Sequence, residues 1–390
     1  MKFITTGIMS ALLACTGGAL LLVKAAEMAG LPDRELLSWF FAVYVMGGLL
    51  NAFLTLKYKI PFAGAHSITG IAFVGSVAAN YPLPVLTGGF ILSGLLMIVV
   101  GSTGLFGRAL RFVPKPIIDA LLAGLLFSSI WGMIPSAIQL PLCGMMAAVG
   151  YWMIPRFVKF LPPVIWSLML GVVGLLLQNR LPWREVAAMP FQLPTLIMPE
   201  FTVFGLFSIA IPLALLIMSN DLAVALASLK GHHYDPPVNK AMAASGVAAM
   251  AAGMLGGHAA NVGGMMTALC SSPEAGSHWR RIGAALTSNV LVILFGLFAW
   301  KMIGWLQIMP APFLSMMTGI PLLGLFIHSV KSVVRERKLI IPTISTFLIA
   351  ALHINLFGLS APLWALLAGV ALVYLRQKFV NRKGGLQDEA

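Results

Sequence analysis

The sequence predicts an all-α polytopic membrane protein with 14 transmembrane segments, arranged as 7+7 inverted repeats. Three observations predict this fold class. The chain of 390 residues is 59% hydrophobic and only 9% charged, whereas soluble domains carry about 25% charged residues. Apolar runs follow one another along nearly the whole chain, with short loops between them. Two of these runs are interrupted by glycine and polar residues at corresponding places in the two halves, as in many secondary transporters.

A helix needs about 20 apolar residues to cross roughly 30 Å of hydrocarbon. We place the crossings, in chain order, at 3–29, 35–56, 61–79, 82–101, 115–133, 138–155, 162–178, 203–229, 239–255, 257–271, 281–304, 312–329, 339–353 and 359–377. This spacing leaves about 28 residues for each crossing with its loop. We therefore expect no separate soluble domain.

The third and tenth crossings are broken. Gly64–Gly70 reads G-A-H-S-I-T-G, and Gly256–Cys270 reads G-G-H-A-A-N-V-G-G-M-M-T-A-L-C. Because glycine permits extended backbone, each break predicts a short extended strand followed by a half-helix, the second beginning near Asn261. Such backbone survives at membrane depth only inside protein or beside a wet cavity. The positive start of a half-helix there attracts an anionic or polar ligand.

Two offsets along the chain predict an internal duplication. His66 and His258 lie 192 residues apart, and Pro114 lies 196 residues before Pro310. The two matches at nearly one offset pair the first half of the chain with the second. Since each half has an odd number of crossings, the second half enters the membrane in the opposite orientation.

The net charge of +13 is distributed as in a membrane protein. Lys and Arg stand singly or in small groups between apolar runs, so we expect no nucleic-acid partner. With the N-terminus inside, twenty of the 25 Lys and Arg lie on inner loops and tails, and the outer side holds Lys24, Arg34, Arg180, Arg184 and Lys301. The positive-inside rule then predicts an inner-membrane protein with both termini in the cytoplasm.

Asp221 is the leading candidate for chemistry. It lies in the eighth crossing beside Ser219 and Asn220, with no Lys or Arg within four residues. A carboxylate near the middle of a span costs about 2.5–3.5 kcal/mol on insertion scales, so it is a functional candidate. Burial favours its neutral form and would let it bind a proton near neutral pH. The alternative is a buried polar network that only ties helices together.

The breaks hold the other candidates. His66 and His258 are able to contact the ligand or carry a proton, or else to satisfy backbone groups that the breaks leave free. Ser67, Thr69 and Asn261 lie where half-helix N-caps are expected, which is compatible with ligand binding. The other candidate, Gly17, allows close approach of a ligand or of a neighbouring helix.

Motifs of other function classes are absent from the sequence. There is no G-x-x-x-x-G-K-[ST] phosphate loop, no Ser-His-Asp arrangement and no zinc signature. An ATP-driven pump in this chain and an enzyme are therefore not expected. We expect no cofactor, with the proton as coupling ion.

Four stretches resemble the benzoate–proton symporter (BenE) family. They are L-C-S-S-P-E-A at Leu269–Ala275, T-G-L-F-G-R from Thr103, L-L-A-G from Leu121 and K-A-A-E-M-A-G from Lys24. The resemblance covers nearly the whole chain, and C-x-S-P-E-A is its most specific part. The family looks like a branch of the group with uracil and xanthine permeases and sulfate permeases.

The resemblance implies two domains that move against each other. A core domain of spans 1–4 and 8–11 would comprise residues 1–113 and 200–306. A gate domain of spans 5–7 and 12–14 would comprise residues 114–199 and 307–390. The resemblance also implies a substrate held between the half-helices of spans 3 and 10 and facing span 8, and a homodimer.

Span 8 departs from the family pattern of Gln-Asn followed by Pro-Gly, because this chain has Asn220 and Asp221 and no Pro-Gly. A carboxylate beside the site would repel a carboxylate substrate unless it were protonated. This departure fits proton-coupled anion uptake, with a neutral or cationic substrate as the alternative.

We therefore predict a proton-coupled symporter that imports a small aromatic carboxylate such as benzoate by elevator-like alternating access. Asp221 would carry the proton. The predicted pocket residues are His66, Ser67, Thr69, Asn220, His258, Ala260, Asn261 and Gly17. The expected partners are this substrate, membrane lipid and a second copy of the chain. The alternatives are a nucleobase or other heterocycle permease and, in another class, an anion channel or motor-like membrane protein.

Overall fold

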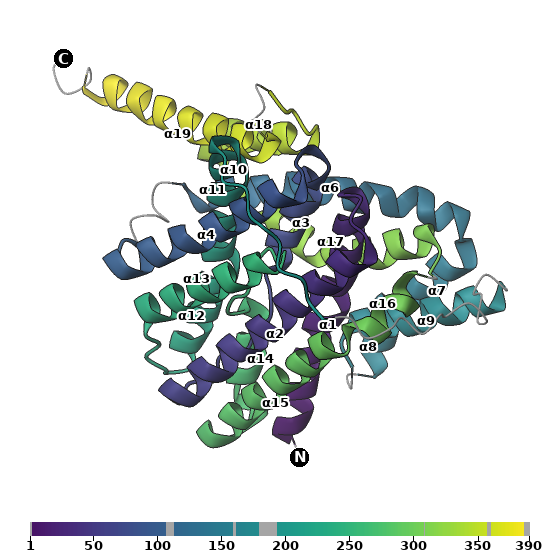
Figure 1. The fold of residues 1–390 in the computed structure, drawn as a ribbon. Coiled ribbons are helices and arrows are strands. Elements are labelled where there is room, and N and C mark those ends of the chain that lie inside the picture. The colour runs from purple at the N-terminus through teal and green to yellow at the C-terminus, as the bar shows by residue number, and fades with distance from the viewer. Residues whose placement is uncertain are drawn as a thin grey trace.

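The computed structural model describes residues 2–106, 113–158, 161–178, 193–307, 309–356 and 360–385. Helices make up most of this part of the chain (Figure 1). The first half supplies α1 (Lys2–Met28), α2 (Asp33–Tyr58), α3 (Ile68–Val77), η1 (Ala78–Asn80), α4 (Leu83–Thr103), α6 (Lys115–Gln139), α7 (Pro141–Trp152), α8 (Ile154–Phe157) and α9 (Pro163–Leu177). Prolines precede several of these helices, because a fixed φ and a missing N–H suit a helix entry.

The second half begins with one long helix over Val203–Gly231. Its parts are α10 (Val203–Gly205), η2 (Leu206–Ala210), α11 (Ile211–Leu216), η3 (Ile217–Leu222) and α12 (Ala223–Gly231). Both η2 and η3 are π-helical. The remaining elements are α13 (Val238–Met254), α14 (Gly264–Ser271), η4 (Pro273–Ala275), α15 (His278–Leu297), α16 (Ala299–Gln307), α17 (Ala311–Arg335), η5 (Arg337–Leu339), α18 (Ile340–Ala351) and α19 (Ala361–Gly385).

Within the described residues, six helices are long and apolar enough to cross a membrane. They are α1, α2, α4, α6, Val203–Gly231 and α15. A pair bent by 44° within α17, Ala311–Ile320 and Leu322–Arg335, makes a seventh. The chain is thus a multi-pass, all-helical membrane protein. The count of fourteen stays a prediction, because several of the remaining apolar helices, such as α9, have fewer than 18 residues.

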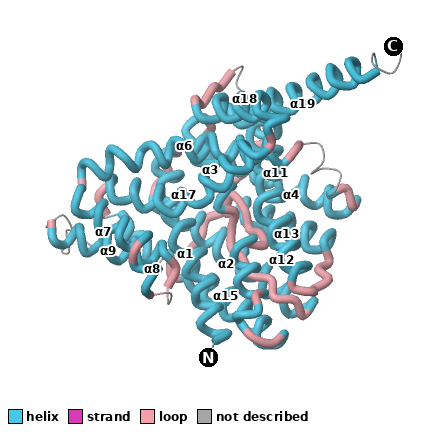
Figure 2. The backbone as a smooth tube through the Cα atoms, turned by 180° about the vertical axis from the view of Figure 1, so that it is seen from behind, coloured by secondary structure: helices cyan, strands magenta, loops and turns pink. Residues whose placement is uncertain are grey.

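The breaks in the third and tenth crossings are confirmed. Helix α3 has 10 residues and α14 has 8, and each follows an extended segment, residues 60–67 and 257–263. Figure 2 shows loop segments running through the interior of the helical body. Each half-helix is therefore too short to cross a bilayer alone.

Two details of the breaks were predicted wrongly. No strand forms in the described part of the two segments. They share only two backbone bonds, from Asn261 N–H to the Ala65 oxygen (3.1 Å) and from Gly263 N–H to the Ala63 oxygen (3.0 Å). The Asn261 oxygen accepts instead from the side chain of Asn51 at 3.0 Å, so no ladder continues. The same bonds keep residues 261–263 extended, and α14 begins at Gly264 rather than near Asn261.

Helix packing follows a paired pattern. Helix α2 packs on α15 as α4 packs on α13, and α7 packs on α9 as α18 packs on α19. Helices α6 and α17 pack on each other. In both views α7 and α9 lie at one side of the molecule and α12 and α13 at the other (Figures 1 and 2). An inverted repeat would give these correspondences, and it stays a prediction, as does the division into core and gate domains.

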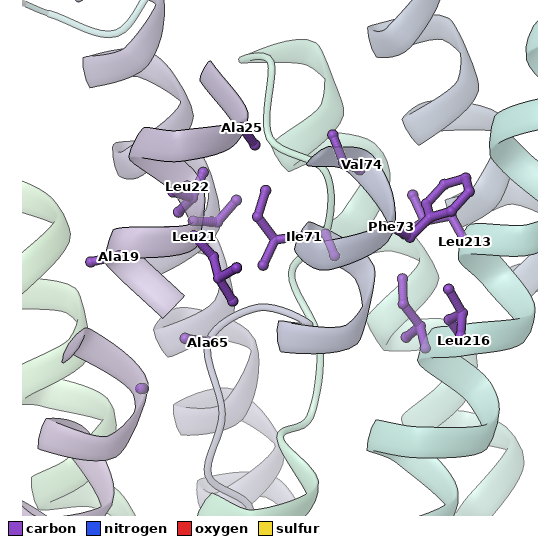
Figure 3. Packing of buried hydrophobic residues seen from close by; sticks show 14 of the residues in the cluster. Ala19, Leu21, Leu22, Ala25, Ala65, Ile71, Phe73, Val74, Leu213 and Leu216 are labelled. Atoms are coloured by element: carbon purple, nitrogen blue, oxygen red, sulfur yellow. The ribbon is translucent and has the colours of Figure 1, made fainter. Parts of the chain in front are cut away.

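Helix α3 is held in place by apolar contacts on two sides. Figure 3 shows its Ile71, Phe73 and Val74 between Leu22 of α1 and Leu213 of α11. All five side chains are buried. Burying apolar surface contributes about 25 cal/mol per Å², so these contacts fix where the polar start of α3 lies.

Candidate functional site

The start of α3 is capped by Ser67, as its position in the sequence predicts. Ser67 has extended backbone, and its Oγ accepts a hydrogen bond from the Gly70 N–H at 2.8 Å. This is the standard N-cap interaction. Thr69 lies in the first turn of α3 and not at the cap.

The Asp221 carboxylate reaches this same start from the long helix. Its Oδ2 accepts a hydrogen bond from Ser67 Oγ and lies 3.5 Å from Thr69 Oγ1. The hydroxyls of Ser67 and Thr69 are 3.0 Å apart. Since the single Ser67 proton goes to the carboxylate, Thr69 is the donor between the two hydroxyls. The side-chain amide of Asn261 interacts with the same carboxyl group, so Asp221 contacts both breaks.

A π-helical turn presents Asp221. Residues Ile217–Leu222 have π-helical geometry, which is rare and occurs frequently at functional sites. Within this turn Ser219 bonds back to the Leu215 oxygen at 2.7 Å, so its hydroxyl is occupied. Asp221 is only 9% exposed. The wide turn therefore carries a buried carboxylate and the neighbouring Asn220.

The imidazole of His258 has both nitrogens in use. Nδ1 accepts from the indole N–H of Trp39 at 3.1 Å, and Nε2 lies 3.1 Å from the Ser67 carbonyl oxygen. An indole can only donate and a carbonyl can only accept. The hydrogen-bond network thus assigns the proton of a neutral imidazole to Nε2. His258 connects the second extended segment to the N-cap of α3.

His66 lies beside it, edge-on, with ring centroids 5.2 Å apart. The Tyr44 hydroxyl donates to the Ala14 oxygen at 3.2 Å. Its oxygen therefore accepts from His66 Nε2, also at 3.2 Å, which leaves a lone pair on His66 Nδ1. This approach requires Gly18, because a Cβ there would lie 2.5 Å from His66 Nε2.

Several buried polar atoms near the breaks have no hydrogen-bond partner. They include His66 Nδ1, Asn220 Nδ2 and Asn261 Oδ1. A buried polar group without a partner costs about 1–3 kcal/mol. Unpartnered groups of this kind are what a polar ligand or water would satisfy.

The structure brings most of the predicted site residues together. The start of α3 is the meeting point of Ser67, Thr69, Asp221 and Asn261. His258 contacts the carbonyl oxygen of Ser67 through Nε2. The side chain of Ala260 packs with Ala42 and Ala252, so it is not available to a ligand. Gly17 belongs to α1, but its own burial and packing lie outside what the structure describes. Whether these residues bind substrate stays a prediction.

Sequence reasoning missed three residues of α2: Trp39, Tyr44 and Asn51. Each places a polar atom inside an apolar helix and hydrogen-bonds a break or its histidine. The sequence feature that could have identified these residues is a polar atom within an apolar run. Nothing in α2 indicates which distant residues they meet.

In the described part of the chain, no group of three or more His, Cys, Asp and Glu residues is arranged to hold a metal ion. This arrangement offers a buried carboxyl group at Asp221 together with hydroxyl, amide and backbone hydrogen-bonding groups.

Known membrane proteins are similar to this chain over nearly its whole length. The family model "BenE: Benzoate membrane transport protein" matches residues 1–375. The inner membrane protein YdcO of Escherichia coli is 28% identical over 93% of this chain and 93% of its own. The benzoate membrane transport protein of Acinetobacter baylyi is 24% identical over 95% of this chain and 94% of its own.

Solved structures share the fold at low identity. The transmembrane domain of the cyanobacterial bicarbonate transporter BicA superposes with a TM-score of 0.63 at 17% identity, covering 95% of this chain and 97% of that domain. The structure of SLC26A9 superposes with a TM-score of 0.64 at 16% identity, covering 97% of this chain and 65% of that one.

Proposed function

The chain belongs to the BenE family of benzoate membrane transport proteins, and on that premise we propose that it is a proton-coupled symporter importing a small aromatic carboxylate such as benzoate. It is a membrane transport protein and not an enzyme. Its relative YdcO is an inner membrane protein. We extend that location to this chain, with both termini in the cytoplasm.

The observation that carries proton coupling is the hydrogen bond from Ser67 to Asp221 at the start of α3. An ionised Asp221 supplies the negative charge that a helix start favours, while the first turn of α3 contains no acidic residue of its own. A substrate carboxylate approaching this charge would be repelled. Binding of a proton to Asp221 removes the repulsion. It also reverses the direction of the hydrogen bond between the two side chains, so that Asp221 donates to Ser67.

The start of α14 supports recognition of an anion. Its N-cap Gly263 provides no side-chain cap, and no acidic residue lies in the first turn. The first N–H groups of a helix have no partner within it, and they favour a carboxylate. Substrate would bind there beside Asn261, and protonated Asp221 would face it. Movement of the core domain against the gate domain, in a homodimer, would then carry both across.

The test is uptake of benzoate by purified protein in proteoliposomes under an inward proton gradient. Accumulation above the outside concentration that an uncoupler abolishes is expected. Current that only follows the benzoate gradient would instead establish a channel.

A thermal-shift series separates the heterocycle alternative. Benzoate, salicylate, uracil, xanthine and sulfate are added singly, and a ligand at 100 times its Kd stabilises the folded state by about 2.7 kcal/mol. Stabilisation by benzoate or salicylate is expected. Stabilisation by uracil or xanthine alone would make the protein a nucleobase permease.

A further inference from the structure

Ser67 is held from two sides. Its hydroxyl contacts Asp221 and caps α3. Its carbonyl oxygen accepts from the Ile71 N–H at 2.9 Å, which begins the helix, and from His258 Nε2 at 3.1 Å. The second of these bonds comes from the other break, 191 residues along the chain.

We propose that His258 is a positioning residue for transport: fixed by Trp39, it anchors the Ser67 carbonyl and thereby sets where the Ser67 hydroxyl meets Asp221. This inference rests on the proposed function, in which Ser67 and Asp221 exchange hydrogen-bond roles when the proton binds. His258 acts through Ser67 and needs no contact with the substrate.

Trp39 fixes the role of the imidazole. Because the indole N–H can only donate, His258 Nδ1 must keep its lone pair, and the ring donates through Nε2 alone. A proton added at Nδ1 would face the Trp39 donor. His258 therefore stays neutral and transmits position rather than charge. This separates it from His66, whose Nδ1 has no partner.

Burial and packing hold the His258 ring in one orientation. His258 is 0% exposed and Trp39 is 1% exposed, so water does not replace a lost bond. The His258 ring also packs against Trp39, His66 and Phe90, with centroid distances of 5.9, 5.2 and 6.4 Å. A buried network of this kind is rigid when all its bonds are made.

Three variants separate hydrogen bonding from packing. In His258→Gln the amide oxygen can accept from Trp39 and the amide nitrogen can donate to Ser67. His258→Phe keeps an aromatic ring and makes neither bond. Trp39→Phe removes the donor while leaving the His258–Ser67 bond in place. Thr346→Val is the control, because it removes a buried 2.8 Å bond to the Pro342 oxygen within α18, away from both breaks.

The first measurement is amide hydrogen exchange of Gly70 and Ile71 in the purified full chain, which reads the anchoring of Ser67 without any substrate. The loss of one buried hydrogen bond corresponds to about a tenfold change. We expect exchange up to about tenfold faster in His258→Phe, a smaller increase in Trp39→Phe, and parental rates in His258→Gln and Thr346→Val.

The second measurement is benzoate transport in proteoliposomes. Proton-driven accumulation should fall about tenfold in His258→Phe, with counterflow reduced less, and should be retained in His258→Gln. Parental exchange and accumulation in His258→Phe would overturn the proposal. So would a folded His258→Gln that fails as His258→Phe does.

These measurements distinguish a failure of the proposed function from a failure of the inference about His258. If the parent protein accumulates no benzoate, that function is wrong, and the exchange rates still decide whether His258 positions Ser67. If His258→Phe does not fold, His258→Gln and Trp39→Phe decide by the same two measurements.

Discussion

The Ser67 hydroxyl donates a hydrogen bond to the Asp221 carboxylate across 154 residues of sequence. One partner caps a half-helix and the other lies in a π-helical turn of the long helix. Under the proposed function, this bond would join the helix start that attracts the anion to the carboxyl group that binds the proton. Substitutions on each side of the bond test these two roles.

Replacement of Asp221 by Asn should abolish proton-driven accumulation of benzoate and leave counterflow partly intact. The amide keeps a hydrogen-bonding partner for Ser67 but has no site for the coupled proton. The measurement is uptake against counterflow in proteoliposomes. Asp119→Asn is the matched control, because Asp119 is also a buried span carboxylate and its partner is Ser332 of α17. Full accumulation by Asp221→Asn would remove Asp221 from the mechanism.

Replacement of Ser67 by Ala should weaken both stability and coupling. Loss of an N-cap side chain costs about 0.5–2 kcal/mol, and Asp221 also loses its closest donor. A lower Tm and reduced accumulation are expected. Ser76→Ala serves for comparison, since it removes a local hydroxyl bond to the Phe73 oxygen near the other end of α3. Equal behaviour of the two variants would show that the Asp221 contact has no role in transport.

Replacement of Gly18 by Ala should displace His66. The added Cβ would lie 2.5 Å from His66 Nε2 and 2.6 Å from Cε1, and overpacking of this kind costs about 1–3 kcal/mol. Gly75→Ala in α3 is the control, because its Cβ would meet only the Ala25 Cβ at 3.9 Å. We expect a lower Tm for Gly18→Ala and an unchanged or higher Tm for Gly75→Ala, read by thermal unfolding in detergent. The reverse order would contradict the described packing.

Replacement of Asn261 by Ala should weaken benzoate binding about tenfold, which equals about 1.4 kcal/mol. The backbone bond of Asn261 to Ala65 remains, so the fold should persist. Calorimetric titration of purified protein measures the change. Asn355→Ala, which loses a contact to the Ala361 N–H near the start of α19, should bind as the parent does. Unchanged affinity in Asn261→Ala would place the pocket elsewhere.

The sequence was sufficient to predict the membrane class and the breaks. Glycine, histidine and hydroxyl residues within otherwise apolar runs indicated where α3 and α14 stop short, and the N-cap at Ser67 followed from residue type. These signals are local, so they can be recognised without knowing the packing. The number of crossings is less accessible, because α7, α9 and α18 are short and depend on their neighbours.

The contacts that organise the site were beyond prediction from the sequence. Trp39 meets His258 and Tyr44 meets His66 across different helices, and no periodicity along α2 indicates either pairing. The π-helical turn at Asp221 depends on backbone bonds that packing selects. Helix α14 starts at Gly264, later than predicted, because residues 261–263 pair with the first break.

The π-helical turn η3 contains one residue more than an α-helical turn would. Each residue added to or removed from a helical turn rotates the remainder of the helix by about 100°. We expect that tightening η3 into α-helical geometry would rotate Asp221 away from Ser67, together with the part of the long helix beyond this turn. Release of the proton from Asp221 would then need only the change of η3 from π-helical to α-helical geometry. A second structure in another transport state, with η3 unchanged, would exclude this motion.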